Sequence, residues 1–278
     1  MSKKINNWLI KGDCHGDFEW MTNIQDYDPF TTAIVILGDV GFNYYLNNKD
    51  VKLKEEVNAR GYRIYCVRGN HEARPQDIEH MIQIYDPNVD GEIYMEEAYP
   101  NIRYFFDFGI YTLNHYKCAV IGGAYSVDKY WRLQKAGVID KKDPNWFNPK
   151  KTGWFYNEQL SQEEMDAATI YFKNQTVDFV FSHTCPFSWE PTDLFLAAIN
   201  QKNVDNSMEI WLDEIKDTFN WFIWCFGHFH ADRLERPYVE QYFHDIENLE
   251  EIYTRWQKYK NTNKLDWWLS KSPQFYYK

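Results

Sequence analysis

The sequence predicts an α/β layered fold, and two observations lead to this prediction. Short apolar runs rich in β-branched and aromatic residues recur along the chain, each bounded by Gly, Pro, Asn or Asp. Stretches typical of helices lie between several of these runs, and alternation of strands with helices is typical of layered α/β proteins. The predicted strands are residues 8–11, 33–37, 62–67, 118–121, 178–181 and 222–226.

The predicted strands lack a clean alternation of apolar and polar residues, which indicates that both faces of the sheet are covered. The predicted helices are residues 17–25, 48–59, 75–84, 161–174 and 205–219. Pro75 suits the first position of a helix, and Ser161 with Glu164 has the spacing of a capping box. Residues 103–106 and 110–113 are separated by three residues and predict a hairpin.

Two segments stand apart from this alternation within what we expect to be one domain over residues 1–278. Residues 125–155 are rich in Lys, Trp, Asn, Pro and Gly, and predict a long surface excursion of the kind that often carries function. The polar and aromatic extension 231–278 is expected to supply extra strands, a helix around residues 247–259, or a dimer contact, and it includes Trp267 and Trp268. Both segments are candidates for shaping the site.

Composition excludes several classes of protein. The 278 residues carry a formal net charge of −11, which disfavours a broad grip on long nucleic acid, although a cationic pocket made by metal ions remains open. No apolar run is long enough for a transmembrane helix, and the first ten residues lack the apolar core of a signal peptide. The five scattered cysteines contain no CxxC pair, which indicates buried thiols in a reducing compartment. We therefore expect a cytoplasmic protein.

Ligand-type side chains follow five of the six predicted strands. The five clusters are Gly12-Asp13-Cys14-His15-Gly16-Asp17, Gly38-Asp39-Val40-Gly41, Arg68-Gly69-Asn70-His71-Glu72, Ser182-His183-Thr184 and Gly227-His228-Phe229-His230. Sites in open α/β sheets form beyond the carboxyl ends of the strands, so these clusters are expected to meet. Asp13 with His15, and His228 with His230, are i,i+2 pairs whose members point to the same side of an extended chain. Imidazole and carboxylate ligands together suit Mn, Fe or Zn.

In this order the clusters resemble the calcineurin-like metallophosphoesterase superfamily, whose motifs are D-x-H, G-D, G-N-H-[DE], an isolated His and G-H-x-H. The resemblance spans Asp13 to His230. It implies a four-layer α/β/β/α sandwich, with two mixed β-sheets flanked by helices, and a pair of divalent metal ions. It implies the following roles: Asp13, His15 and His230 hold the first metal, Asp39 bridges both, Asn70, His183 and His228 hold the second, and His71 lies nearby without binding metal.

This resemblance implies hydrolysis of phosphate esters, with a metal-bound hydroxide attacking phosphorus and two cations about 3.5–4 Å apart stabilising the in-line displacement. His71 is the candidate general acid for the leaving alkoxide, and its alternative role is a hydrogen bond that orients a ligand or the substrate. Arg68 and Arg74 flank the same motif and are candidate phosphate clamps, Arg74 being preferred because it precedes Pro75. Mn²⁺ is the first choice of metal, with Fe or Zn as alternatives.

The Arg68-Gly69-Asn70-His71-Glu72 cluster looks like the version in Ser/Thr protein phosphatases, but the second motif departs from theirs. Those enzymes read G-D-x-x-D-R-G, whereas this chain has Gly38-Asp39-Val40-Gly41-Phe42-Asn43-Tyr44. The Asp that pairs with the catalytic His and the phosphate-binding Arg are missing, which puts protein-phosphatase activity in doubt. Glu72 and Asn43 are the candidates to replace the missing partner of His71.

Three functions remain open from the sequence. The first is a phosphomonoesterase acting on a phosphorylated small molecule, a nucleotide or a phosphoprotein. The second is a phosphodiesterase acting on cyclic nucleotides, dinucleotides or nucleic acid. The third is a non-catalytic binding module, which is disfavoured because no ligand position is replaced. The excursion, with Lys129, Tyr130, Trp131 and Arg132, mixes cations with aromatic rings and is expected to influence the choice of substrate.

Overall fold

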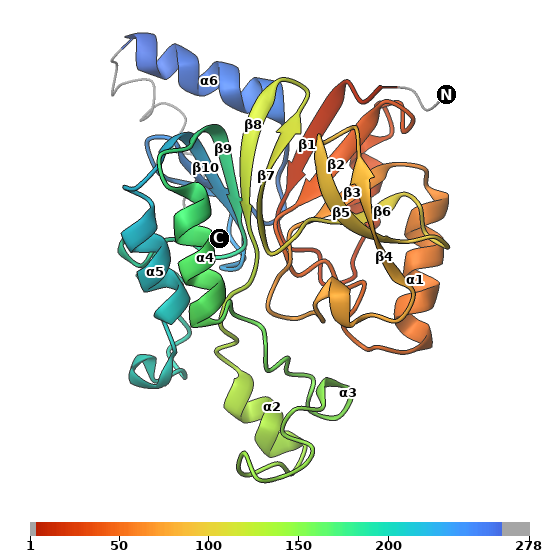
Figure 1. Cartoon of the computed structure of the whole chain (residues 1–278), viewed down its shortest axis with the longest axis vertical. Helices are drawn as coiled ribbons and strands as arrows, with labels where there is room; N and C mark the ends of the chain where they lie inside the picture. Colours follow the sequence, from red (N-terminus) through yellow and green to blue (C-terminus); the bar gives the residue numbers. More distant parts are fainter. Residues whose placement is uncertain (1–3, 263–278) are drawn as a thin grey trace.

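Two mixed β-sheets face each other in the computed structural model of the protein, which describes residues 4–262 (Figure 1). The first sheet consists of β1 (Asn7–Lys11), β2 (Thr32–Ile36), β3 (Arg63–Cys66), β4 (Met81–Asp86), β5 (Gly91–Glu96), β6 (Ile102–Tyr104) and β13 (Ile246–Asn248). The second consists of β7 (Phe108–Leu113), β8 (Tyr116–Ile121), β9 (Thr176–Ser182), β10 (Asn220–Phe226), β11 (Arg233–Arg236) and β12 (Val239–Gln241). The six strands predicted from apolar runs are β1, β2, β3, β8, β9 and β10, and all six are confirmed.

Parallel strands form the middle of both sheets. The first sheet runs β13-β1-β2-β3-β6-β5-β4 and the second β11-β12-β10-β9-β8-β7. The pairs β1–β2, β2–β3, β3–β6, β12–β10, β10–β9 and β9–β8 are parallel, whereas the edge strands pair antiparallel. Because β1, β2, β3, β9 and β10 run in parallel within their sheets, the loops after them lie at the carboxyl ends of the strands.

Helices cover the outer face of each sheet and complete the four predicted layers (Figure 1). The α-helices are α1 (Asn48–Ala59), α2 (Lys129–Lys135), α3 (Pro149–Thr152), α4 (Gln162–Phe172), α5 (Ser207–Ile215) and α6 (Leu249–Thr262). The 3-10 helices are η1 (Glu19–Ile24), η2 (Pro75–Asp77), η3 (Phe187–Trp189), η4 (Thr192–Leu194) and η5 (Gln201–Asn203). Val57 of α1 packs on the first sheet, and Ala168 of α4 and Leu212 of α5 pack on the second.

The main core fills the space between the sheets. Ile10 and Val35 meet Phe179 and Cys225 there, and all four are fully buried. The neighbours of Val35 in β2 face the outer cluster under η1 and α1, so every residue of this strand is buried. Burial on both faces accounts for the continuous apolar runs of the sequence. Trp256 of α6 joins the same core. The helix α6 itself lies at the end of the sandwich opposite α2 and α3 (Figure 1).

The predicted helices have mixed outcomes. Those over α1, α4, α5 and α6 are confirmed, and Ser161 and Glu164 form the expected capping box at the start of α4. The helix expected at residues 17–25 is the 3-10 helix η1. The helix predicted at residues 75–84 is wrong, because only one 3-10 turn follows Arg74 before the chain enters β4, an edge strand paired with β5.

The hairpin predicted over residues 103–113 is also wrong. β6 pairs with β3 and β5 in the first sheet, whereas β7 pairs with β8 in the second. The three intervening residues therefore carry the chain from one sheet to the other. Asp107 in this crossing forms ion pairs with Arg68 at 2.6 Å and with Arg74 at 3.0 Å, which tie the crossing to the loop after β3.

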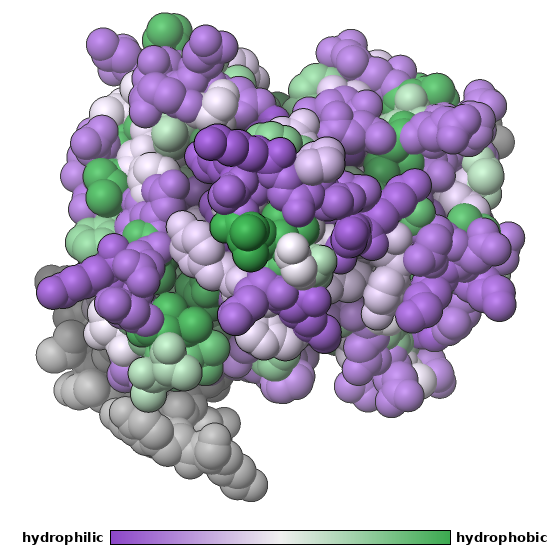
Figure 2. Space-filling view, turned by 90° about the horizontal axis from the view of Figure 1, so that it is seen from below, coloured by the Kyte–Doolittle hydropathy of each residue, from purple (hydrophilic) through white to green (hydrophobic). Residues whose placement is uncertain are grey.

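The excursion over residues 125–155 contains α2 and α3 and projects from the lower end of the sandwich (Figure 1). Its small core consists of Leu133, Val138, Trp146 and Trp154. Seen from below, the surface on this side is mostly hydrophilic (Figure 2). The C-terminal extension adds β11 and β12 to the second sheet, β13 to the first, and then α6. Trp267 and Trp268 lie outside the described residues.

The described part of the chain also bears on two expectations from composition. All five cysteines are buried free thiols, as predicted. Among residues 4–262, none of the helices combines the length and the hydropathy that crossing a lipid bilayer requires.

Candidate metal centre

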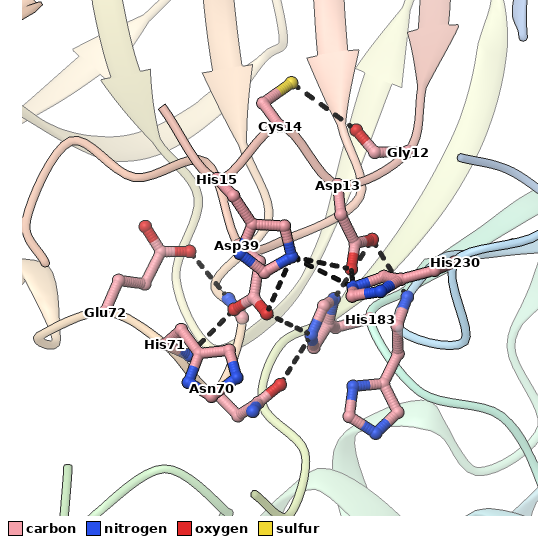
Figure 3. A network of polar contacts seen from close by, with 12 residues as sticks. Gly12, Asp13, Cys14, His15, Asp39, Asn70, His71, Glu72, His183 and His230 are labelled. Atoms are coloured by element: carbon pink, nitrogen blue, oxygen red, sulfur yellow. Dashed lines mark hydrogen bonds and ion pairs between the residues drawn. The ribbon is translucent and has the colours of Figure 1, made fainter. Parts of the chain in front are cut away.

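The loops after β1, β2, β3, β9 and β10 bring the predicted ligands together (Figure 3). Asp13 and His15 follow β1, Asp39 follows β2, Asn70 and His71 follow β3, His183 follows β9, and His228 and His230 follow β10. Figure 3 shows the side chains of Asp13, His15, Asp39, His183 and His230 pointing toward one another. The convergence predicted for the ends of these strands is therefore present.

Four of these residues have a left-handed backbone. The φ angles are 47° at His15, 44° at Asp39, 68° at His228 and 53° at His230. The i,i+2 pairs are thus not in extended chain as expected, and tight turns aim their side chains instead. Such conformations are costly for residues other than glycine and cluster at functional sites.

Backbone hydrogen bonds between neighbouring loops hold these turns. The His15 N–H donates to the Asp39 carbonyl at 2.7 Å, and the Gly16 N–H donates to the Val40 carbonyl at 3.0 Å. In the second sheet, the Gly227 N–H donates to the His183 carbonyl at 3.0 Å. The turns are thereby fixed by the backbone itself, independently of the side chains that they present.

One group of ligand atoms comes from Asp13, His15 and His230. The Asp13 Oδ2 lies 3.8 Å from the His15 Nε2 and 3.4 Å from the His230 Nε2, and the two histidine nitrogens are 2.9 Å apart. Asp13 is buried, whereas the side chains of His15 and His230 are 37% and 51% exposed. This group therefore faces both the interior and solvent.

A second group consists of Asp13, Asp39 and His183. The His183 Nε2 lies 3.6 Å from the Asp39 Oδ2 and 2.8 Å from the Asn70 Oδ1. The other ring nitrogen, Nδ1, lies 2.7 Å from the Leu37 carbonyl oxygen and donates to it, which leaves Nε2 to face the ligands. The Asp39 Oδ2 is also 3.8 Å from the His15 Nε2, so this oxygen lies between the two groups.

His228 takes a different position from the other ligands. Its backbone N–H donates to the Asp13 Oδ1 at 2.9 Å, and its ring centroid lies 4.9 Å from that of His183. Within residues 4–262 its ring nitrogens belong to neither close group. Burial, and then the charge of His183, lowers the pKa of His228 to about 3, so its imidazole is neutral at pH 7.

Two glycines pack directly against the buried carboxylates. A Cβ on Gly69 would lie 2.1 Å from the Asp39 Oδ1, and one on Gly227 would lie 2.3 Å from the Asp13 Oδ1. Neither position therefore has room for a larger residue. The glycines of these motifs provide space for the neighbouring carboxylate.

The electrostatics favour charged carboxylates and a cation between them. Although burial opposes it, the charge of His183 holds the pKa of Asp39 well below its usual value and lowers that of Asp13. Burial in turn lowers the pKa of His183, but the carboxylates of Asp39 and Asp13 outweigh it and raise this pKa to about 9. In the protein without metal, a proton on His183 thus supplies the positive charge. A metal ion would replace that proton.

The residues present fit divalent cations. The Asp13 Oδ2 is buried and has no hydrogen-bond partner among the described residues, although it faces two imidazole nitrogens. A buried carboxylate oxygen without a donor is costly unless a cation contacts it. Carboxylate, imidazole and amide groups are a ligand set that suits Mn²⁺, Fe or Zn²⁺.

His71 sits beside these groups. Its backbone N–H donates to the Asp39 Oδ1 at 2.7 Å, and its ring lies 5.8 Å from that of His15. Burial lowers the pKa of His71, and its Nδ1 is buried without a hydrogen bond to any described residue. Neither suggested partner fills this role. The Glu72 Oε1 accepts from the Gly69 N–H at 2.7 Å, and the Asn43 Nδ2 is itself buried without a partner in the described part of the chain.

A cavity of about 580 Å³ opens beside the two groups, and it reaches His15 and His230 of the first and Asp39 of the second. Its lining includes His15, Asp39, His71 and His230, together with Tyr44, Tyr45, Lys49, Asp128 and Arg132. Asp128 and Arg132 come from the start of the excursion, which thus forms one wall. Sequence reasoning identified the cations and rings of this loop, but it did not show which of them faces the site.

Arg132 is the cavity residue best suited to an anion. Its Nε donates to the Asp128 Oδ2 at 2.7 Å, and its Nη1 donates to the Tyr44 hydroxyl at 2.5 Å and to the Gly153 carbonyl at 2.8 Å. No described residue accepts a hydrogen bond from Nη2. A guanidinium group held in this way keeps donors for a phosphate at small cost in side-chain entropy.

The two arginines predicted from the third motif do not line this cavity. Arg68 is buried, and it contacts Asp107 and the Glu158 carbonyl, each at 2.6 Å. Arg74 contacts Asp107, Glu164 and two backbone carbonyls. Both guanidinium groups hold neighbouring loops together, and their placement gives no support to a role as phosphate clamps.

The chain was compared with protein families, curated proteins and solved structures. Residues 9–232 match the Metallophos family, described as calcineurin-like phosphoesterase. Among solved structures, the phosphopantetheinyl hydrolase PptH from Mycobacterium tuberculosis is similar at a TM-score of 0.42 and 11% sequence identity, with 96% of this chain and 95% of that chain covered. No curated protein matches the sequence. The family match includes every predicted ligand from Asp13 to His230.

Proposed function

The chain belongs to the calcineurin-like phosphoesterase family, and on that premise we propose that it is a phosphomonoesterase that uses two divalent metal ions. The observation that carries the proposal is the position of the Asp39 Oδ2 between the two ligand groups, 3.8 Å from the His15 Nε2 and 3.6 Å from the His183 Nε2, beside a cavity that Asp39, His15 and His230 line. The proposed substrates are a phosphorylated small molecule, a nucleotide or a phosphoprotein. The proposed location is the cytoplasm.

In this proposal, Asp13, His15 and His230 hold the first ion, Asn70, His183 and His228 hold the second, and Asp39 contacts both. When bound, the two ions supply Lewis acidity that activates water and neutralises the phosphoryl oxygens. Mn²⁺ is the first choice, with Fe or Zn²⁺ as alternatives. Asp39 is fixed for this role because its Oδ1 is occupied by the His71 N–H while its Oδ2 is turned to the ligands.

The decisive test compares ester classes on metal-loaded protein. We expect hydrolysis of para-nitrophenyl phosphate with added Mn²⁺, at a rate well above that of bis-para-nitrophenyl phosphate. A panel of phosphorylated metabolites, nucleotides and phosphopeptides would then identify the substrate. Faster cleavage of the diester or of cyclic nucleotides would reassign the chain as a phosphodiesterase. Tight Mn²⁺ binding without turnover of either ester would favour a binding module.

His71 is proposed as the general acid that protonates the leaving oxygen, and because burial lowers its pKa, the protonated form that this role needs is favoured towards acidic pH. Replacing it with Asn is expected to lower kcat by about 10²–10⁴-fold for alkyl phosphates, since these leaving groups need a proton. The loss should be much smaller for para-nitrophenyl phosphate, which leaves without protonation. The measurement is kcat for both esters in the wild type and H71N. Equal losses for both esters would instead assign His71 the orienting role.

Arg132 is proposed to bind the phosphoryl group from the wall of the cavity. R132A is expected to raise KM by about tenfold or more, because a charge-assisted hydrogen bond to an anion contributes about 1.5–3 kcal/mol. The matched control is K135A, which removes an exposed cation from the same helix outside the cavity. Steady-state kinetics of both variants check this expectation. An unchanged KM in R132A would remove Arg132 from the substrate site.

A further inference from the structure

A buried chain of hydrogen bonds leads away from the second ligand group. The Asn70 Nδ2 donates to the Ser126 Oγ at 2.9 Å, and the Ser126 hydroxyl donates to the Glu158 Oε2 at 2.5 Å. The Ser126 backbone N–H donates to the Glu158 Oε1 at 3.1 Å. Asn70, Ser126 and Glu158 are 1%, 1% and 3% exposed, so the chain is closed to bulk water.

The direction of this chain is set at its far end. The ionised Glu158 accepts from Ser126 with both oxygens, and a hydroxyl has a single hydrogen to donate. Because burial raises the pKa of Glu158 to about 7, this direction holds above that pH, and the measurements below are made at about pH 8. Since that proton is committed to Glu158, the Ser126 Oγ can only accept from Asn70. The Asn70 amide must then turn its NH₂ toward Ser126 and its Oδ1 toward His183, 2.8 Å away. If the Asn70 amide were rotated by half a turn, its NH₂ group would face the metal site in place of Oδ1.

We propose that Glu158 is a positioning residue that, through Ser126, fixes the amide of Asn70 so that an oxygen faces the second metal ion. This inference rests on the proposed function, because it takes Asn70 as a metal ligand. Ser126 lies at the start of the excursion and Glu158 three residues after its end, so their contact joins the two ends of this segment next to Asn70. Arg68 holds the segment in place through the Glu158 carbonyl.

The variant E158Q is expected to reverse the chain. The Ser126 backbone N–H cannot change from donor to acceptor, so the oxygen of Gln faces it and the Gln NH₂ faces Oγ. The Ser126 hydroxyl then accepts from the Gln NH₂ and needs a new acceptor for its own hydrogen. Asn70 supplies this acceptor when its amide turns so that Oδ1 faces Ser126. E158Q should therefore present the Asn70 NH₂ to the second ion.

Mn²⁺ titration by calorimetry measures this effect directly, without turnover. We expect E158Q to bind one of two Mn²⁺ ions about 10–100-fold more weakly than the wild type, the usual effect of losing a residue that orients a ligand. The matched control is E190Q, since burial raises the pKa of Glu190 to about 7, as it does that of Glu158. E190Q should bind both ions as the wild type does.

A double-mutant cycle with N70D separates positioning from loss of charge or packing. Asp at position 70 has only oxygen acceptors, so it needs a hydrogen bond donated by the Ser126 hydroxyl. In the wild-type arrangement, this hydroxyl already donates to Glu158. E158Q frees the Ser126 hydroxyl to donate to the Asp at position 70. We therefore expect E158Q to strengthen Mn²⁺ binding and raise the metal-free Tm in the N70D background. In the Asn70 background it should weaken Mn²⁺ binding.

The sign of the E158Q effect decides the outcome. Equal weakening in both backgrounds, or unchanged binding in E158Q, would overturn the positioning role while the wild type still binds two ions and turns over. S126A removes the hydroxyl that links Asn70 to Glu158, so E158Q should no longer change Mn²⁺ binding in the S126A background. An E158Q effect that persists in this background would also overturn the positioning role. A wild type that binds no Mn²⁺ would overturn the proposed function and this inference with it.

Discussion

Replacing Asp39 with Asn is expected to reduce kcat/KM by at least about 10³-fold, and to weaken the binding of both metal ions. The His71 N–H requires an acceptor, so the amide oxygen of Asn takes the place of Oδ1 and the NH₂ takes the place of Oδ2. A donor then faces His15 and His183 where a shared anionic oxygen stood. Two-metal stabilisation of the transition state amounts to several kcal/mol, and about 1.4 kcal/mol corresponds to a tenfold change in rate.

The measurement is kcat/KM at saturating Mn²⁺, combined with metal content after gel filtration. The metal-free variant should unfold below the wild-type Tm at neutral pH, because the hydrogen bond to His71 is kept but the protonated His183 loses one of its two buried carboxylate partners. A folded D39N protein that retains two ions and more than a tenth of the wild-type activity would contradict the shared position of Asp39.

The variant G69A is expected to lose both stability and activity. Its Cβ would lie 2.1 Å from the Asp39 Oδ1 and 2.2 Å from the Asp39 backbone nitrogen. A backbone atom cannot swing aside, so the loops after β2 and β3 must separate. Overpacking of this kind costs about 3 kcal/mol or more. The same displacement moves Asp39 and Asn70, the ligands on either side of the contact.

Urea unfolding and Mn²⁺-dependent turnover measure the two losses. The matched control is G137A, because a Cβ on Gly137 meets nothing within 4 Å and the residue lies in the excursion away from the cavity lining. Its φ of 75° makes alanine cost about 1–2 kcal/mol, with no effect expected on kcat. Wild-type activity in G69A would show that the two loops tolerate separation.

The sequence predicts the strands that are buried on both faces, whereas it does not predict the edge strand β4. β2 is buried throughout and appears in the sequence as an unbroken apolar run. β4 alternates between exposed and partly buried residues, so Pro75 and the residues after it suggested a helix. The crossing at Asp107 is a tertiary feature, because the separation of two strands by three residues does not say whether both enter the same sheet.

At the site, the order of the motifs along the sequence was enough to predict that the metal-binding types of side chain lie close together. The contacts of individual arginine side chains could not be predicted from the sequence in this way. Arg74 precedes Pro75 as a phosphate clamp would, but Glu164 from a distant helix engages it. Arg132 faces the cavity because Tyr44 and Asp128 hold it there, and a loop of weak periodicity gives no sign of those contacts.

The backbone hydrogen bonds that join neighbouring loops within each sheet have a consequence for the choice of metal in the cell. Because the His15 N–H donates to the Asp39 carbonyl and the Gly227 N–H to that of His183, the loops that carry the ligands are already in place before a metal ion binds. Chelation should empty it reversibly, and a different divalent ion should enter without refolding. Supply in the cell, more than the polypeptide, would then decide which element the purified protein contains.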